Sequence, residues 1–411
     1  MIKSWLKRVA RHAGISREFP MPLLSEEEFR SLEKVVLSPR ESMDAVARFT
    51  RNFARYLGVR YGVAVNSGTS ALEIAVAAAG IGPGDEVIVP SYSFYSTASA
   101  VLKARARPVF VDVRLEDGCI DCEEVRKAAT GKTKAVIAVH LAGVPADLDG
   151  LLDICRGRGL TLIEDVAQAV GSEWRGRKLG SFGTLGCFSF QASKNLAVGE
   201  GGFIATDDER LFSLCSAFSN VGLSPDANEW EHVLLGGNYR LPHLEAAILS
   251  ILLEKVDESI ERKEENSAFL TESLKKIPGI ILLRRPPQAT RINHHFYGFR
   301  YDNGKFGGMP KGKFISLLQN EGLPCAGGYP SPLYAHPAFS QNLEALSKCF
   351  AFCEKAKDLQ AGQIHHPNTL KLCAEAAGFE QNFLLGARKE MEGAVEAIQR
   401  LSEQYNGSQS R

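Results

Sequence analysis

Lys194 is the residue whose type and position best suit covalent chemistry. It follows a short aromatic run at 186–190 and precedes a glycine turn at 199–202. A lysine held at the end of a strand can form a Schiff base with a carbonyl cofactor. Ser189 and Ser193 are close to it in sequence and could donate hydrogen bonds to a phosphate. An exposed lysine at a strand end would have the same local sequence, so the assignment depends on the rest of the chain.

A second stretch, 66–72, has the residues expected of an anion site. It follows an apolar strand and opens an alanine-rich helix. Gly68, Thr69 and Ser70 are small enough to let the backbone approach an anion, and free N–H groups at a helix start can bind phosphate. An ordinary helix N-cap with nothing bound explains the same residues. The stretch matches neither the Walker loop nor the Rossmann glycine pattern.

An aromatic ring and an acid follow two further strands. Phe94 lies in a loop at a strand end, where its ring could stack on a flat heteroaromatic ring or simply pack. Asp165 ends the apolar run 161–163, and a buried acid is costly unless it is paired. A protonated pyridine nitrogen would be a suitable partner, and Gln168 could then reach the hydroxyl group of the ring. The alternative is that Asp165 caps a helix.

One ligand, pyridoxal 5′-phosphate, accounts for all four pieces. Its aldehyde suits Lys194, its ring nitrogen suits Asp165, and its flat face suits Phe94. Its phosphate suits the stretch 66–72 together with Ser189. Each piece follows a predicted strand, and open α/β sheets bind ligands at the carboxyl ends of their strands. The sequence therefore predicts a pyridoxal phosphate site at this edge of a sheet.

The elements that must position these residues alternate along the chain. Two helices are expected within 25–57, separated at Ser38 and Pro39. From about residue 62 onward, short continuous apolar runs alternate with helical segments, which is typical of a sheet covered by helices on both faces. We expect strands at 63–65, 86–90, 108–112, 135–140, 161–165, 186–190 and 202–206, and helices at 70–79, 96–102 and 148–157.

The length of 411 residues predicts two domains and an α/β fold class. We expect a large cofactor-binding domain at 1–255, which begins with a helical arm and holds a mostly parallel mixed sheet between helices. A long helical stretch at 240–275 leads out of it. The remainder, 256–411, is expected to form a smaller α+β domain.

Composition argues against several classes of protein. Lys plus Arg and Asp plus Glu number 48 each, so the chain lacks the basic excess of a nucleic-acid-binding protein. No apolar run is long enough to cross a bilayer. The basic start of the chain, with Trp5, Leu6 and Val9, could form an amphipathic helix. We expect that helix to pack on the protein rather than on a membrane.

The nine cysteines are scattered and odd in number, which predicts reduced thiols and a cytoplasmic protein. Cys119 and Cys122 have the spacing of a redox or metal pair. We interpret them as structural, because their neighbours indicate a surface turn and no second pair lies at zinc spacing. Cys349 and Cys353, four apart in an expected helix, are interpreted in the same way. No metal site is predicted.

In their order along the chain, these motifs resemble the DegT/DnrJ/EryC1/StrS family of pyridoxal-phosphate-dependent sugar aminotransferases. The resemblance runs from about residue 20 to 400 and implies the aspartate-aminotransferase fold, or fold type I. It is carried by 66–72, 84–90, 139–143, 164–168, 188–194, 199–202 and 238–240.

The resemblance also implies roles for single residues. Lys194 is similar to the Schiff-base lysine, Asp165 to the partner of the pyridine nitrogen, and Gln168 to the contact of the ring hydroxyl. Asn238 resembles an asparagine that reaches the cofactor of the neighbouring subunit, which implies a homodimer with shared active sites. The implied stacking ring is Phe94, and the implied phosphate ligands are Thr69, Ser70 and Ser189.

The resemblance implies transfer of an amino group from glutamate or glutamine to a keto-sugar that is attached to a nucleotide. The loop 328–334 resembles a substrate-side segment of the branch that acts on cyclitol-like ketones and keto-sugars. A cyclitol-ketone aminotransferase is therefore one alternative. A sugar dehydratase of the same family is another, although dehydratases carry histidine in place of Lys194. A non-catalytic protein that binds the cofactor as a sensor, and a phosphate-binding α/β protein without pyridoxal, are alternatives from other classes.

Three residues depart from the family pattern. Arg105 replaces a usual glycine, Gly237 a usual aromatic residue and His243 a usual acid. We expect the first change to alter a surface turn and the second to open space near the shared site, which leaves the choice of substrate open.

Overall fold

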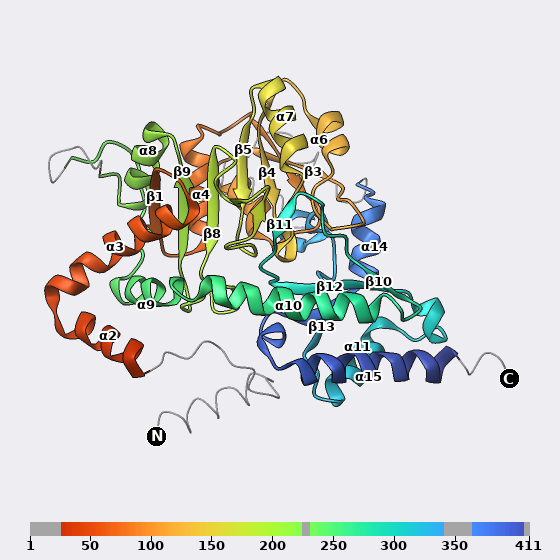
Figure 1. Cartoon of the computed structure of the whole chain (residues 1–411). Coiled ribbons are helices and arrows are strands. Elements are labelled where there is room, and N and C mark those ends of the chain that lie inside the picture. Colours follow the sequence, from red (N-terminus) through yellow and green to blue (C-terminus); the bar gives the residue numbers. More distant parts are fainter. Residues whose placement is uncertain (1–25, 224–230, 341–363, 407–411) are drawn as a thin grey trace.

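The computed structural model describes residues 26–223, 231–340 and 364–406 (Figure 1). Its larger part holds a sheet that stands in the upper half of the view, and its smaller part holds a second sheet below. The long helix α10 (Val256–Leu274) runs across the junction between them, and α15 (Arg388–Asn406) follows the lower edge. The expected basic helix at the start of the chain, Cys349 and Cys353 lie outside the described residues.

The central sheet has seven strands and is mixed but mostly parallel, which confirms the predicted α/β fold class. Only β9 runs antiparallel to both of its neighbours, β1 and β8. In spatial order the strands are β1 (Tyr61–Val65), β9 (Gly202–Thr206), β8 (Leu185–Ser189), β5 (Thr161–Asp165), β4 (Thr133–Val139), β2 (Glu86–Pro90) and β3 (Arg107–Val111).

Continuous apolar strands arise here because both faces of the sheet are covered. Val136 and Ala138 of β4 belong to one hydrophobic core, whereas Ala135 and Ile137 belong to the other. Alternate residues of a strand point to opposite faces, so a sheet buried on both sides needs apolar residues throughout. One face is covered by α3 (Pro39–Leu57), α6 (Cys122–Ala128), α7 (Leu148–Arg158) and α9 (His243–Leu253), and the other by α4 (Gly68–Ala78), α5 (Ser96–Lys103) and α8 (Glu209–Ser219).

The two expected N-terminal helices are present as α2 (Glu26–Leu37) and α3, with the break at Ser38. Phe53 of α3 is fully buried and packs edge-on against Phe188 of β8 and Phe203 of β9, at centroid distances of 5.2 and 4.9 Å. This aromatic cluster fixes the strand that leads to Lys194.

The second sheet is antiparallel in all its pairings, with the order β10 (Ile280–Leu282), β12 (Phe296–Tyr301), β14 (Ala376–Glu380) and β13 (Cys325–Gly327). It packs with α10, α11 (Lys311–Asn320) and α15 around a third core, so the α+β character expected after residue 256 is present. The boundary at 255/256 stays a prediction. The remaining elements are α12 (Pro337–Ser340), α14 (Pro367–Glu375) and the 3-10 turns η1 (Leu141–Gly143), η2 (Asn303–Phe306), η3 (Leu333–Ala335) and η6 (Phe383–Leu385).

A small third sheet was not expected. It joins β11 (Ala289–Arg291) to β6 (Glu173–Trp174) and β7 (Arg177–Lys178), all antiparallel. Strands of two or three residues carry too few positions to show a periodic pattern. This sheet links the chain after α10 back to the large part of the molecule.

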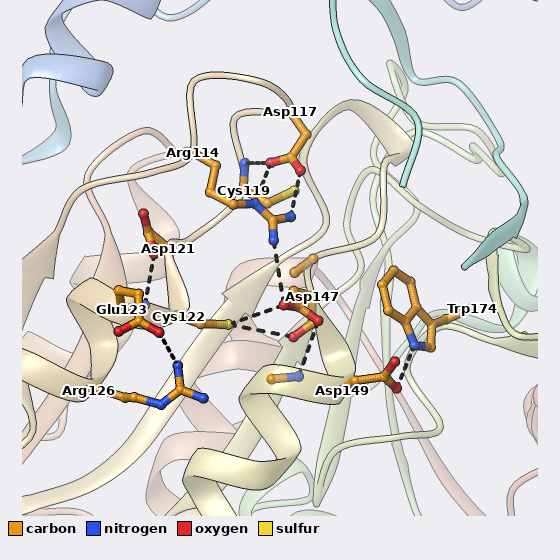
Figure 2. Close-up of polar contacts among 12 residues, drawn as sticks. Arg114, Asp117, Cys119, Asp121, Cys122, Glu123, Arg126, Asp147, Asp149 and Trp174 are labelled. Atoms are coloured by element: carbon orange, nitrogen blue, oxygen red, sulfur yellow. Dashed lines mark hydrogen bonds and ion pairs between the residues drawn. The ribbon is translucent and has the colours of Figure 1, made fainter. Parts of the chain in front are cut away.

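The expectation that Cys119 and Cys122 lie beside a surface turn is wrong, because this turn is largely buried. Asp117 is only 4 % exposed and is held by Arg114 within a polar cluster (Figure 2). Cys122 Sγ lies 3.8 Å from a carboxylate oxygen of Asp147, and burial raises the pKa of Cys122 to about 12. A thiol with such a pKa stays protonated and unreactive. Within the described ranges, no three His, Cys, Asp or Glu side chains gather as a metal site would require.

Two departures from the family pattern now have a structural description. Arg105 has a φ of 60°, in the left-handed region that favours glycine. The space expected beside Gly237 is not open, which corrects that expectation. A Cβ atom at this position would lie 2.3 Å from the ring of Tyr239, so the tyrosine two residues later already fills the space.

Candidate active site

Asp165 ends β5 and is buried, with a side chain held by two hydrogen bonds. Thr97 donates its hydroxyl to Oδ2 at 3.0 Å, and the backbone N–H of Ala167 donates to Oδ1 at 3.2 Å. No helix follows in 166–172, so the alternative that Asp165 caps a helix is wrong. Burial raises the pKa of Asp165, although Ala167, Thr97 and Lys194 each act to lower it. The site thus holds a carboxylate that would gain from a cationic partner.

Lys194 lies in the turn after β8, the strand that pairs with β5. Its backbone N–H donates to Gln191 O at 2.8 Å, which closes the turn. Burial lowers the pKa of Lys194, and the charge of Asp165 opposes that shift. The two side chains therefore come from adjacent strand ends and sense each other electrostatically. An amine whose pKa is lowered is more often unprotonated, and the unprotonated form is the nucleophile and base.

Residues from two strand ends build a small cradle beside them. Ser67 is the N-cap of α4 and accepts the N–H of Ser70, so the ordinary capping interpretation holds for Ser67. Gly68 lies against Ser189, because a Cβ at Gly68 would be 2.6 Å from the Cβ of that serine. Thr69 shares a hydrogen bond of 2.7 Å with Ser96. Glycine at the start of a helix with hydroxyls around it is a setting that suits a phosphate.

Gln168 is fixed at both ends of its amide. Its Oε1 accepts the N–H of Ala142 at 2.7 Å, and its Nε2 donates to the hydroxyl of Tyr329 at 3.0 Å. Gln168, Tyr329 and His295 line a cavity of about 260 Å³ between the large part and the second sheet. His295 Nδ1 is buried without a hydrogen-bond partner, and burial lowers the pKa of His295 to about 3. The cavity therefore presents a neutral imidazole beside the amide of Gln168.

The other two expected residues lie at the surface of the single chain. The side chain of Phe94 is 58 % exposed in the segment between β2 and α5. Asn238 is exposed, and its backbone forms an isolated antiparallel β-bridge with Asn220. The next residue, Tyr239, accepts the N–H of Asn66 at 2.7 Å, so the segment of Asn238 borders the cradle.

The role of Glu164 cannot be read from the sequence. Its carboxylate is fully buried, receives His140 Nε2 at 3.1 Å and accepts the backbone N–H groups of Gly180, Phe182 and Gly183. Burial acts to raise the pKa of Glu164, but these partners lower it on balance. Glu164 thus fixes the chain that leads into β8.

These residues fit pyridoxal phosphate. A buried carboxylate that would gain from a cationic partner suits the ring nitrogen, a buried amine suits the aldehyde, and a helix start with the Gly68–Ser189 contact suits the phosphate. No fragment of this arrangement suits the Walker or Rossmann modes of phosphate binding. The sequence profile of the DegT/DnrJ/EryC1/StrS aminotransferase family matches residues 22–377.

The chain belongs to the DegT/DnrJ/EryC1/StrS aminotransferase family. It is therefore a pyridoxal-phosphate-dependent aminotransferase with fold type I, as the motifs indicate. No helix in the described ranges has the length and apolarity needed to span a bilayer.

The names of several relatives of this aminotransferase state an enzymatic activity. A GDP-perosamine synthase of Caulobacter vibrioides is 34 % identical over 308 residues, which is 74 % of this chain and 82 % of the relative. A Micromonospora echinospora protein is 34 % identical over 295 residues, covering 71 % and 70 %. It carries the provisional name L-glutamine:3-amino-2,3-dideoxy-scyllo-inosose aminotransferase.

Two further similarities bear on function. A protein of Geobacillus stearothermophilus named "Pleiotropic regulatory protein" is 35 % identical over 319 residues, covering 77 % of this chain and 83 % of the relative. The crystal structure of DesV from S. venezuelae, in complex with a ketimine intermediate, superposes with a TM-score of 0.79 at 29 % identity. That match covers 92 % of this chain and 94 % of DesV.

Proposed function

We propose that this aminotransferase moves an amino group from glutamate or glutamine to a keto-sugar that is linked to a nucleotide. The observation that carries the proposal is that two largely buried groups, Asp165 at the end of β5 and Lys194 in the turn after the adjacent strand β8, act electrostatically on each other. The names of GDP-perosamine synthase and of the inosose aminotransferase support ketone acceptors of the sugar and cyclitol type. A role in amino-sugar or polysaccharide biosynthesis fits these relatives.

In the proposed site, Lys194 and Asp165 are the catalytic residues. Bound pyridoxal phosphate supplies an electron sink that stabilises negative charge on the α-carbon of the amino donor. Lys194 Nζ would take the proton from that carbon and deliver it to C4′ of the cofactor, acting first as general base and then as general acid. The carboxylate of Asp165 keeps positive charge on the ring nitrogen, and Thr97 holds it in place.

The remaining proposed contacts bind and orient the cofactor. Gln168 reaches the ring hydroxyl and Phe94 covers the flat face of the ring. The phosphate is held by Gly68, Thr69, Ser70 and Ser189, and by Asn238 of a second copy of the chain. The two-copy arrangement is supported by apolar side chains near Asn238 that a single chain leaves in water. Leu235 is 98 % exposed and Val233 is 53 % exposed.

The proposed assembly is thus a homodimer in which each copy completes the site of the other. Its proposed location is the cytoplasm, which the seven free buried cysteines among the described residues support. The balanced charge of the chain gives no support to a nucleic-acid partner.

The decisive experiment replaces Lys194 by alanine. Lys194→Ala should abolish amino transfer and remove the adduct that borohydride fixes to the protein, while a control variant at an exposed lysine such as Lys134 keeps both. Unchanged activity in Lys194→Ala would contradict the assignment. A protein that binds the cofactor through Lys194 yet transfers no amino group from glutamate or glutamine would favour the sensor alternative, which the name of the Geobacillus relative keeps open.

The acceptor is identified by screening the aminated form of the enzyme against nucleotide keto-sugars and cyclitol ketones. Loss of the pyridoxamine absorbance on adding one class of ketone identifies that class as the amino acceptor. Reaction with a free cyclitol ketone alone would favour the cyclitol alternative, which the Micromonospora relative supports. Loss of a hydroxyl group from the sugar without net amino transfer would favour the dehydratase alternative.

A further inference from the structure

Lys263 is a lysine in the interior of the protein, on the inner side of α10. Its side chain is fully buried, and its Nζ donates to Asn293 Oδ1 at 3.0 Å and to Gln381 Oε1 at 2.7 Å. Among the described residues, no carboxylate forms an ion pair with it. Burial lowers the pKa of Lys263 to about 7. Burying an amine without an anionic partner costs folding free energy. An apolar side chain would avoid this cost, so the role of Lys263 is to be sought in the groups to which it donates hydrogen bonds.

Both acceptors of Lys263 continue to the turn that carries Lys194. Gln381 Nε2 donates to the backbone oxygen of Ser193 at 2.7 Å. Asn293 Oδ1 also accepts Nδ2 of Asn195 at 2.7 Å. Lys263 is therefore connected to the residue before Lys194 through Gln381 and to the residue after it through Asn293.

Asn293 is itself anchored to the large part of the molecule. Its Nδ2 donates to Val170 O at 2.7 Å, and its N–H donates to Ser172 Oγ at 2.8 Å. Gln381 comes from the second sheet, directly after β14, and its N–H donates to His295 O. The turn with Lys194 is thus held between two rigid supports, and Lys263 is the one side chain among them that bonds to both Asn293 and Gln381 in the described part of the chain.

We propose that Lys263 is a positioning residue that fixes the main chain on both sides of Lys194 and thereby sets where Lys194 Nζ lies relative to Asp165. This inference depends on the proposed role of Lys194. Whether its nitrogen is charged or neutral, Lys263 has enough N–H groups to donate to both amide oxygens. Without it, Gln381 Oε1 loses its donor and the amide is free to rotate away from Ser193.

The test compares Lys263→Met with the matched control Lys178→Met. Lys178 lies on β7 with its Nζ over the ring of Tyr56 and 3.3 Å from Glu173 Oε1, so a methionine there also removes the polar contacts of a largely buried lysine. The apoprotein of each variant is mixed with pyridoxal phosphate, and the visible absorbance of the adduct with Lys194 is followed in time. We expect Lys263→Met to slow its appearance by about tenfold or more, because small errors in the position of a reacting group cost large factors in rate.

Steady-state kinetics give a second readout. We expect kcat of Lys263→Met to fall by a similar factor while the KM for the amino donor changes by less than about twofold, as for a lost alignment of a reacting group. Lys178→Met should match the wild type in both measurements. Equal absorbance rates and kcat in Lys263→Met and the wild type, with only a lower melting temperature, would overturn the proposal and leave Lys263 a stabilising residue.

The two branches can be tested separately. Gln381→Leu and Asn195→Ala each remove one branch, and they keep the proposal testable if Lys263→Met does not fold. Each should slow formation of the adduct, and the effect of Gln381→Leu should largely disappear in a Lys263→Met background, because both changes act on the same path. Full additivity, or no effect of either single change, would contradict the proposal.

Failure of this inference can be told from failure of the proposed function. If Lys194→Ala still forms the borohydride-stable adduct, the assignment of Lys194 is wrong. If Lys194→Ala forms none while Lys263→Met reacts at the wild-type rate, only the positioning role is wrong.

Discussion

Thr97 donates a hydrogen bond of 3.0 Å to Asp165, and so links the first turn of α5 to the end of β5. The hydroxyl of Ser93 lies 2.8 Å from that of Thr97, so a short chain of buried hydroxyls leads to the carboxylate. This donor favours the ionised form of Asp165 against the burial that raises its pKa. In the proposed site, Asp165 would hold a cationic ring nitrogen only while it is ionised, so Thr97 would act on the cofactor through Asp165.

Thr97→Val is therefore expected to weaken cofactor binding. Valine keeps the shape of threonine but removes the hydroxyl, and we expect a loss of about 1–2 kcal/mol, or roughly 5- to 30-fold in Kd, for a hydrogen bond to a charged group. The pKa of Asp165 should rise further, so affinity should begin to fall at a higher pH when solutions are acidified. Titration of the apoprotein with pyridoxal phosphate between pH 5 and 8 measures both effects.

Thr97→Ser is the control for this change, because serine keeps the hydroxyl and loses only a methyl group. It should retain near-wild-type affinity. An equal loss in the serine and valine variants would mean that packing, not the hydrogen bond, is what Asp165 depends on.

Gly68→Ala is expected to damage the cradle. The added Cβ would lie 2.6 Å from the Cβ of Ser189, so the end of β8 must move away from α4. Overpacking of this kind costs about 1–3 kcal/mol of unfolding free energy, and the displaced Ser189 should also lower affinity for pyridoxal phosphate. The control is Gly157→Ala in α7, where a Cβ meets nothing within 4 Å and helix propensity favours alanine. Cofactor affinity unchanged in Gly68→Ala would argue against a phosphate at this helix start.

The strands and the candidate residues near their ends could be predicted from the sequence, because both follow from local sequence pattern. Asp165 ends one buried strand and Lys194 lies in the turn that follows another, and each strand contains an apolar run, as a sheet buried on both faces requires. Their partners could not be found in the same way. Thr97 lies 68 residues before Asp165 in the chain, and no periodicity connects the two.

The hydrogen-bond network around Lys263 shows most clearly which contacts cannot be predicted from the sequence. Its two acceptors lie 30 and 118 residues away, on segments that only the fold brings together. A single buried lysine in a polar helix has no distinguishing sequence feature, because most helical lysines lie in water. The expectation of a surface turn at Asp117 fails for the opposite reason. Its residues are typical of a surface turn, but Arg114 pairs with the carboxylate and allows its burial.

Arg105→Gly is expected to stabilise the protein. Arg105 is exposed and has a φ of 60°, where a side chain with a Cβ is strained and glycine is not. After allowing for the greater flexibility of glycine in the unfolded chain, we expect a gain of about 0.5–1 kcal/mol in the free energy of unfolding. Arg105→Ala removes the same charge but keeps the strain, so it should gain little. Thermal unfolding of the two apoproteins separates the backbone effect from the charge effect.

Lys263 should make stability depend on pH. Its folded pKa of about 7 lies below the value near 10.5 that a lysine has in an unfolded chain, so the unfolded state binds more protons between these values. Stability of the wild type should therefore rise with pH across this window. Relative to Lys263→Met, we expect a gain of about 1–2 kcal/mol between pH 7.5 and 9. His294 and His295, which interact electrostatically with Lys263, stay neutral there because burial lowers the pKa of each to about 3.

Denaturant unfolding of the two apoproteins at several pH values measures this difference. Both proteins contain every other titratable group, so their difference reports on Lys263 alone. Parallel pH profiles would mean that Lys263 keeps an ordinary pKa in the folded protein.

Mixed dimers test whether the active site is shared between two copies of the chain. Lys194→Ala and Asn238→Asp should each be inactive alone, the first without its amine and the second with a negative charge against the phosphate. If Asn238 serves the site of its neighbour, a hybrid of the two variants contains one site with both defects and one site with none. Such hybrids, purified by two different tags, should regain about half of the wild-type activity.

The matched control combines Lys194→Ala with Asp165→Asn. Both residues belong to the same chain's site, so each site of that hybrid keeps one defect and no activity should return. Recovery in the first hybrid but not in the second places Asn238 across the interface, next to the exposed Leu235 and Val233. Absence of recovery in both hybrids, with dimers still present by light scattering, would mean that Asn238 acts within its own chain, and the shared-site arrangement would be abandoned.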